Sequence, residues 1–184
     1  MEATAWETLR RVDLAGARDV LDVGCGTGAL LEGVGRELPA ARLAGVDLSP
    51  GMLTVSRRTL GPRAMLAVGD AARLPFRSRT FDLALSLSAL HYWPEPEAAL
   101  GEIRRVLRPG GRVAITDWCA DFRIDRLRDR IRRWVEPAHD RVHRSAELDT
   151  MLARSGFCDV RIERWRTGWR WGLMTATATR PADR

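Results

Sequence analysis

Three glycines alternate within five residues of the sequence, at Gly24, Gly26 and Gly28. Glycine lets the backbone turn sharply and approach a ligand closely, because it has no Cβ. A short apolar run precedes the glycines and a helical pattern follows them, so the turn joins a strand to a helix. A helix N-terminus presents unpaired N–H groups. The pattern therefore predicts a turn that binds the polar part of a ligand.

An acidic residue follows this turn at a spacing typical of nucleotide-binding sheets. Asp47 lies about 20 residues beyond the glycines, at the end of the second predicted strand. A carboxylate there accepts hydrogen bonds from ribose hydroxyls. The turn also fits Gly24-x-Gly26-x-x-Ala29, a dinucleotide fingerprint, so these residues alone leave the ligand open. The other interpretation of Asp47 is a cap for the next helix.

A histidine and the only tyrosine of the chain lie together after the fourth predicted strand. His91 is a candidate general base or substrate contact, because histidine exchanges protons readily near neutral pH. Tyr92 would shape a substrate pocket there, since aromatic neighbours are common in such pockets. The other interpretation of His91 is a structural residue that caps the following helix.

The elements that must hold these residues follow from short apolar runs that alternate with amphipathic stretches, a pattern typical of a parallel α/β sheet. Ser49 is predicted to cap a helix that begins at Pro50. The candidate residues then follow the carboxyl ends of strands, where open α/β sheets bind ligands. Strands are predicted over residues 20–23, 42–46, 64–68, 81–87 and 112–116, with further helices over 30–38 and 96–107.

The two ends of the chain show a different order. Apolar residues recur at helical spacing between 124 and 135, and Ser145 is predicted to cap a second helix. Two strands follow, over residues 159–166 and 173–179, and the last one is expected to be antiparallel because a short link cannot make a parallel crossover. A short helix at the N-terminus is predicted from Trp6, Leu9 and Val12.

The motif Asp22-x-Gly24-x-Gly26-x-Gly28 resembles the first motif of the class I S-adenosylmethionine-dependent methyltransferases. The resemblance is to the small-molecule branch that includes the ubiquinone and menaquinone methyltransferases. Four later blocks are similar to those of the family, in the same order, so the resemblance runs from about residue 20 to 118. These blocks are residues 45–53 (GVDLSPGML), 69–76 (GDAARLPF), 81–84 (FDLA) and 107–112 (LRPGGR).

The resemblance implies an α/β fold: a Rossmann-like, doubly wound, mostly parallel seven-stranded sheet with an antiparallel last strand. It implies S-adenosylmethionine as cofactor and S-adenosylhomocysteine as product. The chain is expected to form a single domain over residues 1–184, with residues 123–155 as a helical lid insertion. The implied cofactor-binding residues are Asp22, Gly24, Cys25, Gly26, Gly28, Asp47, Leu48, Met52, Asp70, Ala71, Ser86 and Leu87.

The family also implies a role for each part of this set. Asp22 and the turn would lie along the methionine part of the cofactor, and Asp47 would accept from both ribose hydroxyls. Leu48 and Met52 would sandwich the adenine, unless Met52 fills the core. Asp70 would accept from the adenine amino group, unless it only forms a turn through its side chain. The backbone of Ser86 and Leu87 would lie near the amino end of the cofactor.

Composition limits the partners. The chain has 184 residues, 45% of them apolar, and a net charge of +6. All 30 basic residues are arginine, which indicates coding bias, so nucleic acid is a less favoured partner than a small-molecule acceptor. No apolar run is long enough to span a membrane. The N-terminus shows no signal peptide, and a cytoplasmic location follows by default. We expect a monomer or a homodimer.

Several features argue against other methyltransferase activities and against a metal site. Residues 86–89 (SLSA) lack the Pro-Pro-aromatic block of base-amino methyltransferases and the nucleophilic cysteine of cytosine C5 enzymes. No metal site is expected, because His139-x-x-x-His143 has no obvious third ligand. The arginine-rich stretch 123–133 is interpreted as a solvated helix face, with contacts to acidic substrates, nucleic acid or membrane surfaces as alternatives. Further acceptor-side candidates are Asp117, Trp118, Asp121, Phe122, Trp134 and His139.

The sequence therefore predicts methyl transfer from S-adenosylmethionine to a small organic acceptor, at O, N or C, by direct in-line displacement. The alternatives are an RNA or protein methyltransferase, a nicotinamide-dependent oxidoreductase and a non-catalytic S-adenosylmethionine-binding module. The first is favoured by charge alone. The second is permitted by the glycine turn but not by the later blocks.

Overall fold

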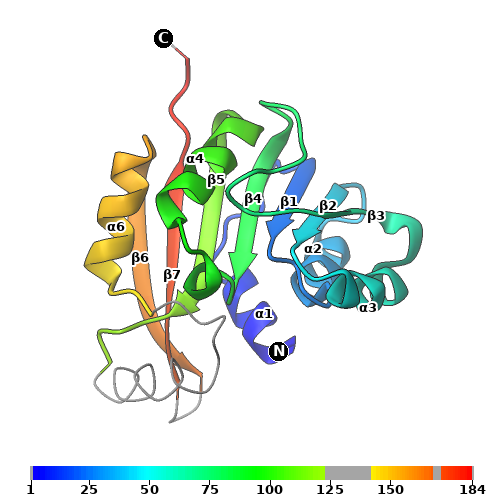
Figure 1. Ribbon diagram of the computed structural model, residues 1–184, viewed down its shortest axis with the longest axis horizontal. Coiled ribbons are helices and arrows are strands. Elements are labelled where there is room, and N and C mark those ends of the chain that lie inside the picture. Colours follow the sequence, from blue (N-terminus) through cyan, green and yellow to red (C-terminus); the bar gives the residue numbers. More distant parts are fainter. Residues whose placement is uncertain (1, 123–141, 168–170, 184) are drawn as a thin grey trace.

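The computed structural model describes residues 2–122, 142–167 and 171–183 (Figure 1). Within them, seven strands form one sheet in the order β3-β2-β1-β4-β5-β7-β6. The strands are β1 (Asp19–Val23), β2 (Arg42–Asp47), β3 (Ala64–Val68), β4 (Phe81–Leu87), β5 (Leu107–Trp118), β6 (Cys158–Thr167) and β7 (Trp171–Thr179). Strands β1 to β5 are parallel to one another, and β7 lies antiparallel between β5 and β6. The predicted fold class is confirmed, including its antiparallel last strand.

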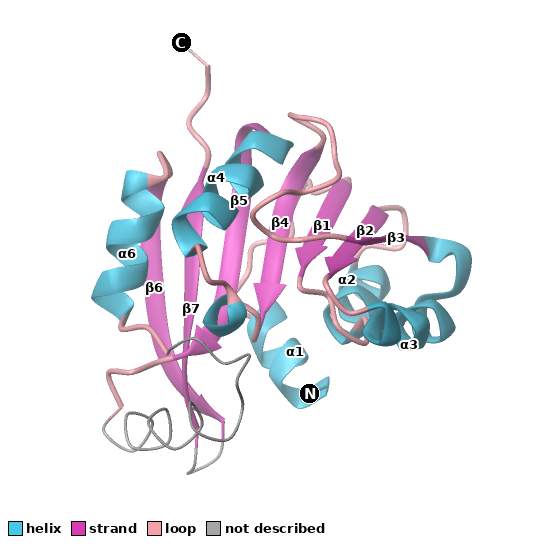
Figure 2. Cartoon of the chain, in the orientation of Figure 1, coloured by secondary structure: helices cyan, strands magenta, loops and turns pink. Residues whose placement is uncertain are grey.

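Helices cover both faces of this sheet (Figure 2). Apolar side chains of neighbouring residues on a strand point to opposite faces, because the side-chain period of a strand is two. Val20 packs in the cluster that α1, α2 and α3 share, whereas Leu21 packs in the cluster that α4 and α6 share. The helices are α1 (Glu2–Leu9), α2 (Ala29–Glu37), α3 (Pro50–Leu60), α4 (Pro96–Val106) and α6 (Ser145–Arg154).

The start of α3 is confirmed, since Ser49 Oγ accepts from the Met52 N–H at 3.3 Å and Pro50 opens the helix. The predicted cap of α6 is wrong, because Arg144 is the cap and Ser145 is the first helical residue. The Ser145 hydroxyl donates to Asp121 instead, and the Arg144 N–H donates to the Glu147 carboxylate at 2.9 Å. The side chain that supports this helix start is therefore an acidic residue in its first turn.

Two other boundaries differ from the prediction. Helix α1 ends at Leu9, so Val12 lies beyond it. Strand β5 begins at Leu107 rather than at Arg112, because Leu107 pairs with Phe81 of β4. Residues 109–111 (PGG) therefore lie within the strand. Gly110 makes this course possible with a φ of 77°.

Some predictions lie outside the described residues. These are the helix between 124 and 135, the arginine-rich stretch 123–133, Trp134 and His139. Of the lid expected over residues 123–155, only the part from residue 142 is described, and it consists mainly of α6. Among the described residues, no helix combines the length and the apolar character that crossing a membrane requires.

Candidate functional site

The turn between β1 and α2 is formed by three glycines in the left-handed region, with φ values of 77° at Gly24, 51° at Gly26 and 88° at Gly28. Side chains at two of these positions would clash. A Cβ on Gly24 would lie 2.4 Å from the Ala89 Cβ, and one on Gly28 would lie 2.7 Å from the Ser56 Oγ. A Cβ on Gly26 would meet nothing within 4 Å. The turn thus packs tightly at its two ends and has open space at its centre.

Asp47, the last residue of β2, fixes the position of this turn. Its Oδ2 accepts from the Gly26 N–H at 2.8 Å, and its Oδ1 accepts from the Ser49 N–H at 2.9 Å. The N–H groups of Gly24 and Cys25 donate to the Val46 carbonyl. The helix cap itself is Ser49, so Asp47 contributes to the glycine turn as well as to the start of α3.

Asp22 is a buried carboxyl group beside the same turn. It is 1% exposed, and its Oδ1 has no hydrogen-bond partner among the described residues. Loss of solvation, together with the nearby charge of Asp47, raises the pKa of Asp22 to about 8. Buried polar atoms are almost always paired, so an unpartnered acceptor here indicates a missing donor.

A prediction follows for stability. The carboxyl of an unfolded Asp has a pKa of about 4. Between about pH 4 and pH 8, Asp22 therefore stays protonated in the folded chain but is ionised in the unfolded chain. The free energy of unfolding therefore falls as pH rises through this window. Replacing Asp22 with asparagine removes the effect. Thermal melts measure the Tm of the variant minus the Tm of the wild-type protein. We expect this difference to increase by at least about 4 °C between pH 5 and pH 8. A Tm difference that does not change with pH would contradict the assignment.

The apolar residues predicted to flank an adenine are exposed. Leu48 is 71% exposed and Met52 is 47% exposed, so the interpretation of Met52 as a core residue is wrong. Both follow the carboxyl end of β2. Their exposure leaves both side chains accessible to a ligand beside the glycine turn.

The neighbouring strands place the other predicted residues along the same sheet edge. Asp70 follows β3, and its Oδ1 accepts from the Ala72 N–H at 2.9 Å. The side chain of Asp70 therefore does form a local turn, as its alternative interpretation proposed. Ala71 is buried. At the end of β4, the Ser86 Oγ donates to the Val23 carbonyl at 2.8 Å and Leu87 is buried. These two residues can offer only backbone groups to a ligand.

A buried histidine–carboxylate pair lies at the ends of β4 and β5. His91 Nδ1 lies 2.8 Å from Asp117 Oδ1, and the His91 backbone N–H donates to Asp117 Oδ2 at 3.2 Å. His91 is 3% exposed and Asp117 is equally well buried. Because a carboxylate only accepts, the geometry places the proton of a neutral imidazole on Nδ1 and makes Nε2 the basic nitrogen.

Two rings pack against this histidine. The Tyr92 ring centroid lies 4.1 Å from that of His91, and the Trp118 ring stacks on it at 5.4 Å and 27°. Ser88, between β4 and His91, has a φ of 55°, which is rare for a residue with a side chain. Such conformations are enriched at functional sites, although Arg79 and Asp159 also have positive φ values in this chain. The helix-capping interpretation of His91 is wrong, since the cap of α4 is Glu95 and the imidazole binds Asp117.

The pairing of His91 with Asp117 was missing from the sequence analysis, although both residues were candidates. The available signal was their position, because His91 follows β4, Asp117 lies at the carboxyl end of β5, and these two strands are adjacent and parallel. Other acceptor-side candidates have structural contacts. Asp121 binds Ser145, and Phe122 packs under the Arg166 guanidinium at 4.9 Å.

The three cysteines are free thiols with little nucleophilic character. Burial raises the pKa of Cys119 to about 11 and also raises the pKa values of Cys25 and Cys158. A thiol with a raised pKa is a poor nucleophile and a poor metal ligand. Within residues 2–122, 142–167 and 171–183, no three His, Cys, Asp or Glu side chains gather as a metal site would require.

Comparisons with known proteins agree with this geometry. Residues 21–115 match the family model described as a methyltransferase domain. A phthiotriol/phenolphthiotriol dimycocerosates methyltransferase of Mycobacterium leprae is 35% identical over 138 residues, which are 70% of this chain and 51% of that protein. A malonyl-[acyl-carrier protein] O-methyltransferase of Hahella chejuensis is 41% identical over 97 residues, which are 52% of this chain and 35% of that protein.

A solved structure shares the fold over almost the whole chain. The phosphoethanolamine N-methyltransferase 2 of Haemonchus contortus, in complex with S-adenosyl-L-methionine, superposes with a TM-score of 0.78 at 18% identity. The match covers 97% of this chain and 52% of that one. The chain thus spans about half the length, or less, of each of these three proteins.

Proposed function

This chain belongs to the family of methyltransferase domains, and on that premise we propose that it transfers the methyl group of S-adenosylmethionine to a small organic acceptor. The observation that carries the proposal is the buried His91–Asp117 pair. The pair lies at the carboxyl ends of β4 and β5, one strand from the glycine turn that ends β1. A proton acceptor and the glycine turn, which has open space at Gly26, thus lie at the same edge of the sheet.

Three features support S-adenosylmethionine as the ligand of the turn. The open space at Gly26 leaves room for the cofactor beside the turn. The unpartnered Asp22 Oδ1 can accept a hydrogen bond from the cofactor's ammonium group. Asp47 offers a carboxylate to the ribose hydroxyls, and Leu48 and Met52 offer apolar surface to the adenine. The chain's own residues therefore fit S-adenosylmethionine, the ligand of the Haemonchus structure.

The chemistry requires little of the protein beyond alignment and a base. When bound, S-adenosylmethionine supplies a methyl group on a sulfonium, which is already a strong electrophile. His91 Nε2 would accept the proton of the acceptor as its nucleophilic atom attacks the methyl carbon in line with the breaking carbon–sulfur bond. The electron pair of that bond stays on sulfur, and the proton leaves His91 for solvent after transfer. Asp117 would hold the tautomer and stabilise the imidazolium.

The His91–Asp117 pair favours one class of acceptor. A hydroxyl group is a weak nucleophile until it loses its proton, whereas a carboxylate or a free amine needs no base before it attacks. A histidine held by a buried carboxylate is therefore most useful for O-methylation of a hydroxyl. The Hahella relative is named as a malonyl O-methyltransferase, so its name supports oxygen as the acceptor atom but gives a carboxylate rather than a hydroxyl. We extend that atom type to this chain, with a hydroxyl as the acceptor group. We also propose that residues 1–184 form a single domain and that the protein is a monomer or a homodimer.

The test is transfer of a labelled methyl group. The protein is incubated with S-adenosylmethionine labelled in the methyl group and with matched acceptors that carry an alcohol, a phenol, a carboxylic acid or an amine. We expect label in alcohols or phenols. Label only in carboxylic acids or amines would overturn the hydroxyl assignment, and no label in any acceptor would count against methyl transfer to small molecules.

A further inference from the structure

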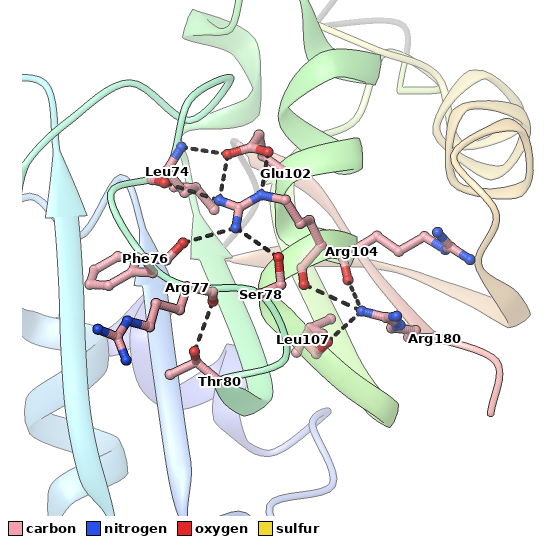
Figure 3. A network of polar contacts seen from close by, with 10 residues as sticks. Leu74, Phe76, Arg77, Ser78, Thr80, Glu102, Arg104, Leu107 and Arg180 are labelled. Carbon is pink, nitrogen blue, oxygen red and sulfur yellow. Dashed lines mark hydrogen bonds and ion pairs between the residues drawn. The ribbon is translucent and has the colours of Figure 1, made fainter. Parts of the chain in front are cut away.

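The loop between β3 and β4, residues 69–80, carries Asp70 and Ala71 but has no regular secondary structure of its own. Two side chains of α4 hold it in place (Figure 3). The Arg105 guanidinium donates to the carbonyls of Leu74 at 3.1 Å and Phe76 at 2.9 Å, and to the Ser78 hydroxyl at 3.2 Å. One guanidinium thus bonds three residues of the loop.

Glu102 completes the arrangement from the preceding turn of α4. Its Oε1 accepts from Arg105 Nε at 2.6 Å, and its Oε2 accepts both from Arg105 Nη2 and from the Leu74 N–H, each at 2.8 Å. The hydrogen bond from Arg105 keeps the pKa of Glu102 below its usual value. Leu74 is therefore bonded through both its N–H and its carbonyl, so its backbone is fixed to the helix.

Leu74 lies close in the chain to Asp70 and Ala71, the residues proposed to bind the adenine. The Arg73 N–H donates to the Asp70 carbonyl at 3.0 Å, which closes a tight turn immediately before Leu74. Ala71 and Leu74 are buried in the same apolar cluster as α4. A shift of Leu74 away from the helix would therefore move the Asp70–Ala71 segment with it.

We propose that Glu102 and Arg105 are positioning residues that set the affinity and the base specificity of the cofactor site by holding the Asp70 loop against α4. The inference rests on the proposed function, because it takes S-adenosylmethionine as the cofactor and Asp70 as the acceptor for the adenine amino group. It assigns to the pair no contact with the cofactor and no part in methyl transfer.

The test compares two probes that differ at that amino group and at the adjacent ring nitrogen N1, which carries a hydrogen in hypoxanthine. S-adenosylhomocysteine carries it, and S-inosylhomocysteine has an oxygen in its place. Calorimetric titration of Glu102→Gln and Arg105→Lys should show a Kd for S-adenosylhomocysteine raised about tenfold. The preference for adenine over hypoxanthine should fall by a similar factor, and kcat at saturating cofactor should stay within about twofold of the unchanged protein. Lysine cannot replace Arg105, because it lacks the planar fork that bonds several acceptors at once.

Arg180 supplies a matched control on the other side of the same helix. Its Nη1 donates to the backbone carbonyls of Arg104 at 2.8 Å, Arg105 at 3.3 Å and Leu107 at 2.7 Å, and none of these lies in the Asp70 loop (Figure 3). Arg180→Lys removes comparable bonds, so it should lower Tm without changing either Kd or the base preference. Unchanged base preference in both Glu102→Gln and Arg105→Lys, or an equal loss in Arg180→Lys, would overturn the proposal. If the wild-type protein does not bind S-adenosylhomocysteine, the proposed function is rejected, and this inference is rejected with it.

Discussion

Replacing His91 with alanine is expected to lower kcat by about 10² to 10⁴-fold, the range typical of losing a general base. The Kd for S-adenosylhomocysteine should stay within about twofold, because His91 lies after β4, where its imidazole pairs with Asp117, and is not among the residues assigned to the cofactor. Initial-rate kinetics with a methylated acceptor, together with calorimetric titration, separate the two effects.

The control for folding is His91→Asn. Removing the imidazole leaves the buried carboxylate of Asp117 without its side-chain partner, which alone can destabilise a protein by about 3–5 kcal/mol. Asparagine can keep a donor near the position of Nδ1 but has no basic nitrogen. It should therefore restore stability and not activity. Asp117→Asn should also lose activity, because an amide does not enforce the tautomer that leaves Nε2 basic. Equal loss of cofactor affinity and turnover in His91→Asn would mean that the histidine is structural.

Replacing Asp47 with alanine is expected to raise the Kd for S-adenosylhomocysteine by at least about 10²-fold. Two hydrogen bonds from ribose hydroxyls to a carboxylate are each worth about 1.5–3 kcal/mol, and about 1.4 kcal/mol corresponds to a tenfold change in affinity. The same carboxylate also holds the Gly26 and Ser49 N–H groups, so the glycine turn would lose a constraint. Isothermal titration of the variant measures the change directly.

The comparison variant is Asp47→Asn, which retains one oxygen and a similar shape. It should lie between the alanine variant and the unchanged protein in Kd. Circular dichroism of both variants checks that the sheet remains folded. Affinity that is unchanged in Asp47→Ala would remove the carboxylate from the cofactor site and leave it only the role of fixing the turn.

The strands of this fold could be predicted because their signals are local. The apolar run before Gly24 ends where the glycines begin, and Ser49 and Pro50 mark the start of α3 with residues that suit those positions in any protein. The start of β5 could not be predicted in this way. Residues 109–111 have the composition of a turn, and only pairing across the sheet makes them part of a strand.

The contacts of the candidate site depended on tertiary structure. His91 and Asp117 are 26 residues apart in the sequence, and their pairing depends on the register between β4 and β5. Glu102 and Arg105 have the spacing of an ordinary ion pair on a helix surface. Nothing in that spacing indicates that the pair bonds the backbone of the Asp70 loop. The burial of Asp22 is likewise a property of the assembled sheet, although its position in the motif could be recognised.

The central claim is that the glycine turn binds S-adenosylmethionine, and titration calorimetry with S-adenosylhomocysteine tests it most directly. The unchanged protein should bind S-adenosylhomocysteine with a micromolar Kd and should not bind NADH under the same conditions. Binding of NADH in place of S-adenosylhomocysteine, or binding of neither by protein that circular dichroism shows to be folded, would contradict the account.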